Sequence, residues 1–129
     1  MARDLFQQFA DGTLVSGGQK TDVRLCAWNT HKDFAGVSLK TVVTADQTTG
    51  LFTCHLVRIE AHCKIGLHTH PASIELHEVV TGNGVCLIDQ EEVPYAPGTM
   101  AVIARNAPHE VRAGAEGLCL FAKFITIPA

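Results

Sequence analysis

The sequence is poor in charged and aromatic side chains, and it has no long hydrophobic run. Charged residues make up 18% and aromatic residues 6% of the 129 positions, whereas apolar residues make up 47%. No stretch approaches the roughly 20 apolar residues that cross a bilayer, and the first residues lack the pattern of a secretory signal. The net charge is −3, and no Lys/Arg cluster of the kind that binds nucleic acid occurs. We therefore expect a soluble, cytoplasmic protein that binds neither nucleic acid nor membranes.

The chain also lacks the cysteine pattern of a disulfide framework. Its five cysteines are scattered, and no two of them form a Cys-x-x-Cys pair. An odd number of scattered cysteines without a secretory signal predicts reduced thiols. Most of them should be small buried hydrophobes. A cysteine that lines a pocket or binds a metal is the alternative.

The length fits one domain with a single hydrophobic core. A composition with so few charges is typical of a compact barrel or sandwich that also buries surface against a second subunit. We expect a homodimer that associates through edge strands of a sheet.

Short runs rich in Val, Ile, Leu, Thr and Phe recur along the chain and are separated by Gly, Pro, Asn and Asp. Such spacing predicts an all-β protein, an antiparallel sandwich or closed barrel. The expected strands cover 23–28, 37–44, 51–60, 74–80, 84–89, 99–104, 109–113 and 117–127. The sequence Thr-Gly-Asn-Gly at 81–84 is interpreted as a hairpin turn. Residues 1–20 form an N-terminal extension with room for a short helix over 4–9, and residues 21–129 form the barrel domain.

Histidines are concentrated in one segment, since five of the seven fall within 55–77. On a strand, residues i and i+2 face the same side, so His68 and His70 can direct their rings at one ion. Pro71 then interrupts the strand, and the next strand can bring Glu75 back to the same point. A carboxylate beside two imidazoles suits Fe, Mn, Ni, Co or Zn and leaves coordination positions open.

The spacing around these residues resembles the two motifs of the cupin family. In the first motif, His-x-His is followed by four residues, a Glu, six residues and a Gly; here these are His68, His70, Glu75 and Gly82. In the second motif, a Gly precedes a His at fixed spacing, and Gly98 and His109 fit it. The chain is similar to small single-domain bacterial cupins over about 52–111.

This resemblance implies a jelly-roll barrel that holds one divalent transition metal (Fe, Mn, Ni or Zn) inside it. The implied ligands are His68, His70, Glu75 and His109. Two glycines of the motifs are replaced here, one by His62 and one by Asn106. Both positions lie in turns that we expect to need a positive φ, which His and Asn tolerate better than most residues.

His77 shares strand parity with Glu75, so it should also face the cavity. There it could orient a substrate, transfer a proton or hydrogen-bond a metal ligand; a hydrogen-bonded core histidine is the alternative. Glu75 and His77 are therefore the catalytic candidates. His55 is interpreted as a buried histidine on an apolar strand face, and His62 as a turn residue.

Four further side chains are less strongly indicated as functional residues. If its strand face lined the barrel, Arg58 could hold a carboxylate substrate; a surface arginine is the alternative. Tyr95 and Arg105 are candidate groups at the rim of the barrel, and His31 is expected at the surface.

Two classes of function stay open. The first is a mononuclear-metal enzyme that acts on a small organic molecule, as a dioxygenase or as an isomerase or lyase. The second is a sensor that binds a metal or small molecule without catalysis. The family that the chain resembles contains both classes, and a fold does not decide between them.

Overall fold

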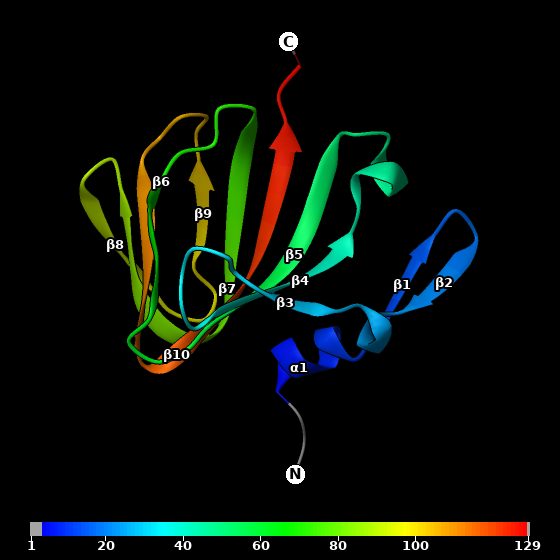
Figure 1. Cartoon of the computed structure of the whole chain (residues 1–129), viewed down its shortest axis with the longest axis horizontal. Helices are drawn as coiled ribbons and strands as arrows, with labels where there is room; N and C mark the ends of the chain where they lie inside the picture. The colour runs from blue at the N-terminus through cyan, green and yellow to red at the C-terminus, as the bar shows by residue number, and fades with distance from the viewer. Residues whose placement is uncertain (1–3, 129) are drawn as a thin grey trace.

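The computed structural model describes residues 4–128, and strands dominate this part of the chain (Figure 1). Ten strands, one α-helix and two 3₁₀ helices alternate as α1 (Leu5–Ala10), β1 (Thr13–Ser16), β2 (Gln19–Asp22), η1 (Val23–Leu25), β3 (Trp28–Thr30), β4 (Val37–Val43), η2 (Ala45–Thr48), β5 (Phe52–Ile59), β6 (Lys64–His68), β7 (Ser73–Ile88), β8 (Glu91–Tyr95), β9 (Met100–Ile103) and β10 (His109–Thr126). All strand pairs are antiparallel. The predicted all-β jelly-roll architecture is confirmed.

Eight of the strands form one continuous, folded sheet. The order is β3-β4-β5-β10-β7-β8, with β6 paired to β10 and β9 paired to β7. The two longest strands, β7 and β10, pair with each other from Ser73 and Thr126 at one end to Ile88 and His109 at the other. Because these two strands take part in both walls of the barrel, they connect its two halves (Figure 1).

The prediction of a hairpin turn at 81–84 is wrong. β7 runs without a break through Thr-Gly-Asn-Gly, and β10 runs in the same way through the turn expected after Ala113. Their ladder changes register between Ala113 and Leu118. A β-bulge at such a position bends both strands, so this stretch is a corner between the two walls. The glycines serve the close approach of the two backbones: a Cβ on Gly82 would lie 2.1 Å from the carbonyl oxygen of Gly117.

Several elements differ from the sequence prediction, and two of them, the strands β1 and β2, lie in the segment where no strand was expected. The first half of the strand expected over 23–28 is instead the 3₁₀ helix η1, which is capped by the Asp22 side chain. The strands β6 and β8 were not predicted, because Lys64–His68 is short and contains a Gly, and Glu91–Tyr95 carries two Glu and Pro94. Proline is compatible with β8 because this strand lies at a sheet edge.

The N-terminal segment covers the outer face of the sheet. Helix α1 begins after Asp4, whose side chain accepts a hydrogen bond from the Gln7 amide, and it buries Phe6 and Ala10 against Leu56 of β5. The hairpin of β1 and β2 extends away from the barrel, and β2 crosses residue 20, the expected boundary of the extension (Figure 1). The first three residues of that extension lie outside the described residues.

Buried Lys40 fastens this segment to the barrel. Its ammonium group donates hydrogen bonds to the carbonyl oxygens of Ala10 (2.9 Å) and Val23 (3.0 Å), and its side chain is 2% exposed. It also lies 5.4 Å from the centre of the Trp28 ring, where a cation is attracted to the aromatic face. The charge is therefore compensated by two carbonyl dipoles and one ring.

The expected positive-φ turns are confirmed: His62 has φ 61° and Asn106 has φ 65°. The five cysteines are free, as predicted, but the expectation that most of them are buried is wrong, because only Cys54 and Cys86 are. Among residues 4–128, no helix is long and apolar enough to span a bilayer.

Candidate metal centre

Four side chains from different parts of the chain meet inside the barrel. They are His68 at the end of β6, His70 in the following turn, Glu75 near the start of β7 and His109 at the start of β10. One ligand atom from each lies within 4.8 Å of the other three. Strand pairing explains part of this arrangement, because His109 is the direct partner of His68 in the ladder of β6 and β10.

The two histidines of the His-x-His pair reach the centre by different routes. His68 lies in β6 as expected, but the strand ends there, so His70 belongs to the turn rather than to a strand face. The turn is nevertheless fixed. The Asn106 amide donates to the carbonyl oxygen of His70 (3.0 Å), and Phe124 packs edge-to-face on the His70 ring with 4.9 Å between centroids.

Backbone carbonyls fix the tautomers of two rings. Nδ1 of His68 donates to the carbonyl oxygen of Gly66 (2.6 Å), and Nδ1 of His109 donates to that of Ala107 (2.9 Å). Both rings therefore direct Nε2 at the common point, which is the usual way in which a protein orients a metal-binding histidine. Nε2 of His70 is buried and has no hydrogen-bond partner. A buried polar atom without a partner is costly, and an ion at this point would satisfy it.

The two oxygens of Glu75 have separate partners. Oε1 lies 3.0 Å from Nε2 of His109 and 3.4 Å from Nε2 of His70, whereas Oε2 lies 2.7 Å from Nε2 of His77. Adjacent ligand atoms bound at about 2.1 Å to one ion are separated by roughly 3.0–3.4 Å. The Oε1 side of the carboxylate therefore has the spacing of a metal ligand, and the donor set fits a transition metal.

The charges of the cluster follow from its hydrogen bonds. Burial alone would raise the pKa of the Glu75 carboxyl, but the hydrogen bonds with His109 and His77 outweigh it and hold the pKa well below its usual range. Burial would lower the pKa of His109, but hydrogen bonds to Glu75 and Ala107 raise it. For His68 and His70, burial prevails and lowers the pKa, so both stay neutral and able to bind a metal at neutral pH.

His77 lies beside the cluster and connects Glu75 to a tyrosine. It is 3% exposed; its Nε2 faces Glu75, and its Nδ1 lies 2.8 Å from the hydroxyl oxygen of Tyr95. Because the carboxylate accepts from Nε2–H, Nδ1 accepts from the Tyr95 hydroxyl. Burial raises the pKa of Tyr95 far above its ordinary value, which keeps that hydroxyl protonated.

Tyr95 is thus not a rim group, as the sequence suggested, but a buried one that is 1% exposed. The stretch Glu91–Tyr95 has no alternation of polar and apolar residues that could have revealed this position.

The cluster borders a cavity of about 290 Å³. Glu75 and His77 both line it, as expected, and His31 lines it with Asp33 and Phe34 from the loop between β3 and β4. His31, expected at the surface, is partly exposed and also lines the cavity, which the sequence did not indicate.

The other candidate residues from the sequence analysis lie outside the cavity. Arg58 is on the outer face of the barrel, 4.4 Å from the centre of the Trp28 ring, so it does not reach the cavity, and exposed Arg105 does not line it either. His55 is half-buried and hydrogen-bonds Thr41 (2.9 Å) and Thr53 (3.0 Å). No cysteine is among the described residues that line the cavity.

Comparisons with known proteins agree with this architecture. Residues 55–122 match the cupin domain family. No curated protein sequence matches the chain significantly.

Three of the similar solved structures come from proteins with different descriptions. A predicted oxalate decarboxylase from Thermotoga maritima superposes with a TM-score of 0.74 at 15% identity, over 81% of this chain and 96% of that one. KdgF from Halomonas sp. gives 0.68 at 16% identity, over 79% and 87%. The polyketide cyclase RemF from Streptomyces resistomycificus gives 0.72 at 12% identity, over 84% and 78%. At such identities the likeness concerns the fold alone.

Proposed function

Because the chain belongs to the cupin domain family, we propose that it binds one divalent transition metal (Fe, Mn, Ni or Zn) and acts as an enzyme on a small organic molecule. The proposed ligands are Nε2 of three histidines and Oε1 of one glutamate, namely His68, His70, Glu75 and His109. The observation that carries this proposal is the partnerless, buried Nε2 of His70, aimed at three other ligand atoms. Nε2 of His68 and Nε2 of His109 are oriented by hydrogen bonds from Nδ1 to backbone carbonyls, and the bond between Nε2 of His109 and Oε1 of Glu75 would be replaced when both atoms bind the metal.

The chemistry follows from the donor set and the cavity. A metal with three nitrogen ligands and one oxygen ligand keeps open positions and supplies Lewis acidity or redox chemistry. We assign the reaction to the dioxygenase or the isomerase and lyase classes. Proteins described as a predicted oxalate decarboxylase and a polyketide cyclase share this fold, so the fold is compatible with enzymes.

We propose that Glu75 and His77 act as one unit. Both ring nitrogens of His77 are engaged, with Glu75 and Tyr95, so its first role is to hold the carboxylate. In an isomerase or lyase reaction, the Nε2–H of His77, 2.7 Å from Oε2, would keep Glu75 ionised and oriented.

Metal analysis tests the ligand set. Protein purified without an affinity tag should carry about one equivalent of a transition metal. The variants H109A and H70A should lose most of it, whereas H55A, which removes a histidine outside the cluster, should retain it. A wild-type protein with no metal above background, or an H109A variant with full metal content, would refute the assignment.

Turnover then separates the enzyme from a sensor. Bound Fe, Mn or Ni together with oxygen uptake on a panel of diketones, thiols and phenols supports a dioxygenase. Turnover without oxygen uptake supports the isomerase or lyase class. Tight binding of a small molecule without turnover would favour the sensor.

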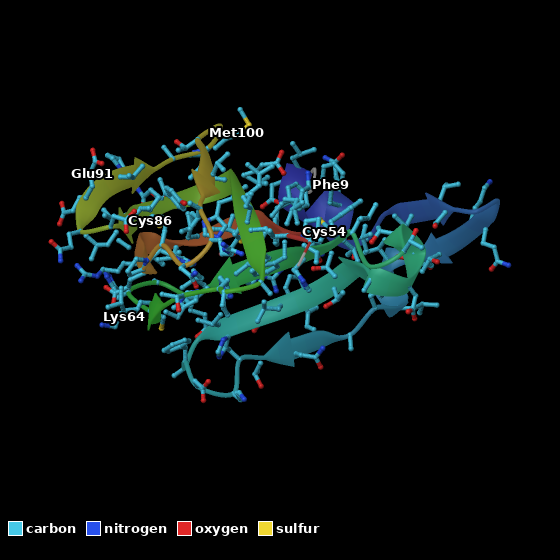
Figure 2. The ribbon with its side chains drawn as sticks, turned by 90° about the horizontal axis from the view of Figure 1, so that it is seen from above. Phe9, Cys54, Lys64, Cys86, Glu91 and Met100 are labelled. Carbon is cyan, nitrogen blue, oxygen red and sulfur yellow. The ribbon has the colours of Figure 1, made fainter. Side chains whose placement is uncertain are left out.

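The proposed assembly is a homodimer formed through edge strands. Edge strand β9 carries Met100 and Val102 on one face, and they are 69% and 73% exposed. Figure 2 shows Met100 pointing away from the barrel. An exposed apolar strand edge is a site of association. Light scattering should give twice the chain mass of 13.9 kDa; the chain mass itself would contradict the dimer. The reduced thiols agree with the cytoplasm as the proposed location.

A further inference from the structure

The charge balance of the cavity constrains which molecules it can accept. Apart from the metal ligands and His77, its polar lining residues are His31, Asp33 and Thr69, and Asp33 is exposed to solvent. Among the described residues no Lys or Arg lines it. The protein thus offers no cation of its own to pair with an anionic group of a ligand.

The rest of the wall is apolar. Its larger side chains come from both walls of the barrel and from the loop at the mouth: Phe34, Leu39, Val57, Val111, Leu120 and Phe124. A volume of about 290 Å³ is at the small end of the roughly 300–1,000 Å³ of ligand cavities. A ligand that fills it must be compact and must place apolar surface against these side chains.

With a divalent metal bound, the centre carries one net positive charge, because Glu75 is the one anionic ligand. One negative charge on the ligand makes the complex neutral. A second negative charge would be placed against the apolar wall without a partner, and burial of an unpaired charge is strongly unfavourable. Arg58, the candidate that could have compensated it, points away over Trp28 and Phe6.

We infer that the cavity accepts a compact molecule that reaches the metal through one monoanionic oxygen chelate and carries an apolar body without a second charge. By the same argument, a dicarboxylate whose second carboxylate lies against the apolar wall is disfavoured. This inference rests on the proposed metal centre and names the substrate class for it.

Three hydroxamic acids with one common chelating head test the inference. Acetohydroxamate provides the head alone, benzohydroxamate adds an apolar ring, and the hydroxamate of succinic acid adds a carboxylate. Co²⁺-loaded protein reports their binding through its visible absorption and by calorimetry. Benzohydroxamate should bind roughly tenfold more tightly than acetohydroxamate because the wall buries its ring, and the charged compound should bind more weakly than acetohydroxamate.

A matched pair of variants tests the role of charge. Leu39 lines the cavity, whereas its neighbour Ser38 pairs with Arg58 on the outer face. L39K should raise the affinity for the succinic compound relative to benzohydroxamate, and S38K should leave the ratio unchanged. If L39K does not fold, the wild-type series decides alone.

The outcomes separate the two proposals. Protein that does not retain Co²⁺ would overturn the metal centre itself. Protein that retains Co²⁺ but binds the succinic compound as tightly as benzohydroxamate, or binds none of the three, would overturn the inference and leave the metal centre standing.

Discussion

Nε2 of His77 lies 2.7 Å from Oε2 of Glu75, whereas the other oxygen, Oε1, faces His70 and His109. The hydrogen bond reserves one oxygen of Glu75 for His77 and presents the other to the metal position. The hydroxyl of Tyr95 fixes the tautomer of His77 through a hydrogen bond to Nδ1, on the other side of the ring. The orientation of one proposed metal ligand therefore depends on a residue that does not touch the metal.

Removal of that hydroxyl should weaken metal binding. Y95F keeps the ring in the core but deprives Nδ1 of His77 of its donor, so His77 can change tautomer and release Glu75. Partners behind metal ligands typically contribute 10–100-fold to affinity, and we expect a loss of about tenfold for Y95F. Competition with a chelator of known affinity measures it. F121L is the control, because it alters a ring that packs against Phe6 and Phe9 outside the cavity. Equal metal affinities of Y95F and the wild type would contradict the role of Tyr95.

The corner of β7 and β10 should depend on Gly82. In G82A the new Cβ would collide with the carbonyl oxygen of Gly117, at a backbone φ of 81°. G18A is the matched control, since Gly18 has φ 77° but nothing within 4 Å of an added Cβ. The φ penalty alone costs about 1 kcal/mol, whereas the clash should bring the loss for G82A to about 3 kcal/mol or more. Urea unfolding measures both, and similar losses would show that the corner relaxes easily.

Lys40 should determine whether the N-terminal segment stays attached. K40M keeps the length of the side chain but leaves the carbonyl oxygens of Ala10 and Val23 without their donor. We expect a loss of about 2 kcal/mol, since a buried acceptor loses its partner, and faster hydrogen exchange in α1. The exposed lysine of β2 gives the control K20M. Unchanged exchange in α1 would show that Phe6 and Ala10 hold the helix without Lys40.

His55 should make stability depend on pH. Burial lowers its pKa below the ordinary value of 6.5, so the unfolded chain takes up a proton at a higher pH than the folded one. The contribution of neutral His55 is full above pH 6.5 and declines as the pH falls from there to the folded-state pKa. The difference in unfolding free energy between wild type and H55Q, both free of metal, should shrink over that window. A constant difference between pH 7.5 and 5 would refute the assignment.

The sequence predicts the barrel because runs of β-forming residues alternate with turn residues. The meeting of His68, His70, Glu75 and His109 was implied by the resemblance to the cupin motifs, and it agrees with the cluster in the structure. The positive φ of His62 was also predictable, since a turn position restricts the residue types that it tolerates.

Other features depend on contacts between distant segments and left no local pattern. Gly82 looks like a turn residue, and only the neighbouring β10 shows that it allows a close approach of two strands. Tyr95 follows a proline in a charged stretch, and its burial results from pairing with Gly84 of β7. The outward direction of Arg58 was open because strand parity does not say which face of a strand lines the barrel.

The long pairing of β7 with β10 also has a consequence for how the protein folds. Glu75 and His109 come from strands that meet only after long stretches of chain have been closed into loops, so they form contacts of high contact order, which arise late and slowly. Because the site forms late, we do not expect metal binding to assist the first steps of folding. A bound ion should instead lower the unfolding rate and leave the refolding rate nearly unchanged.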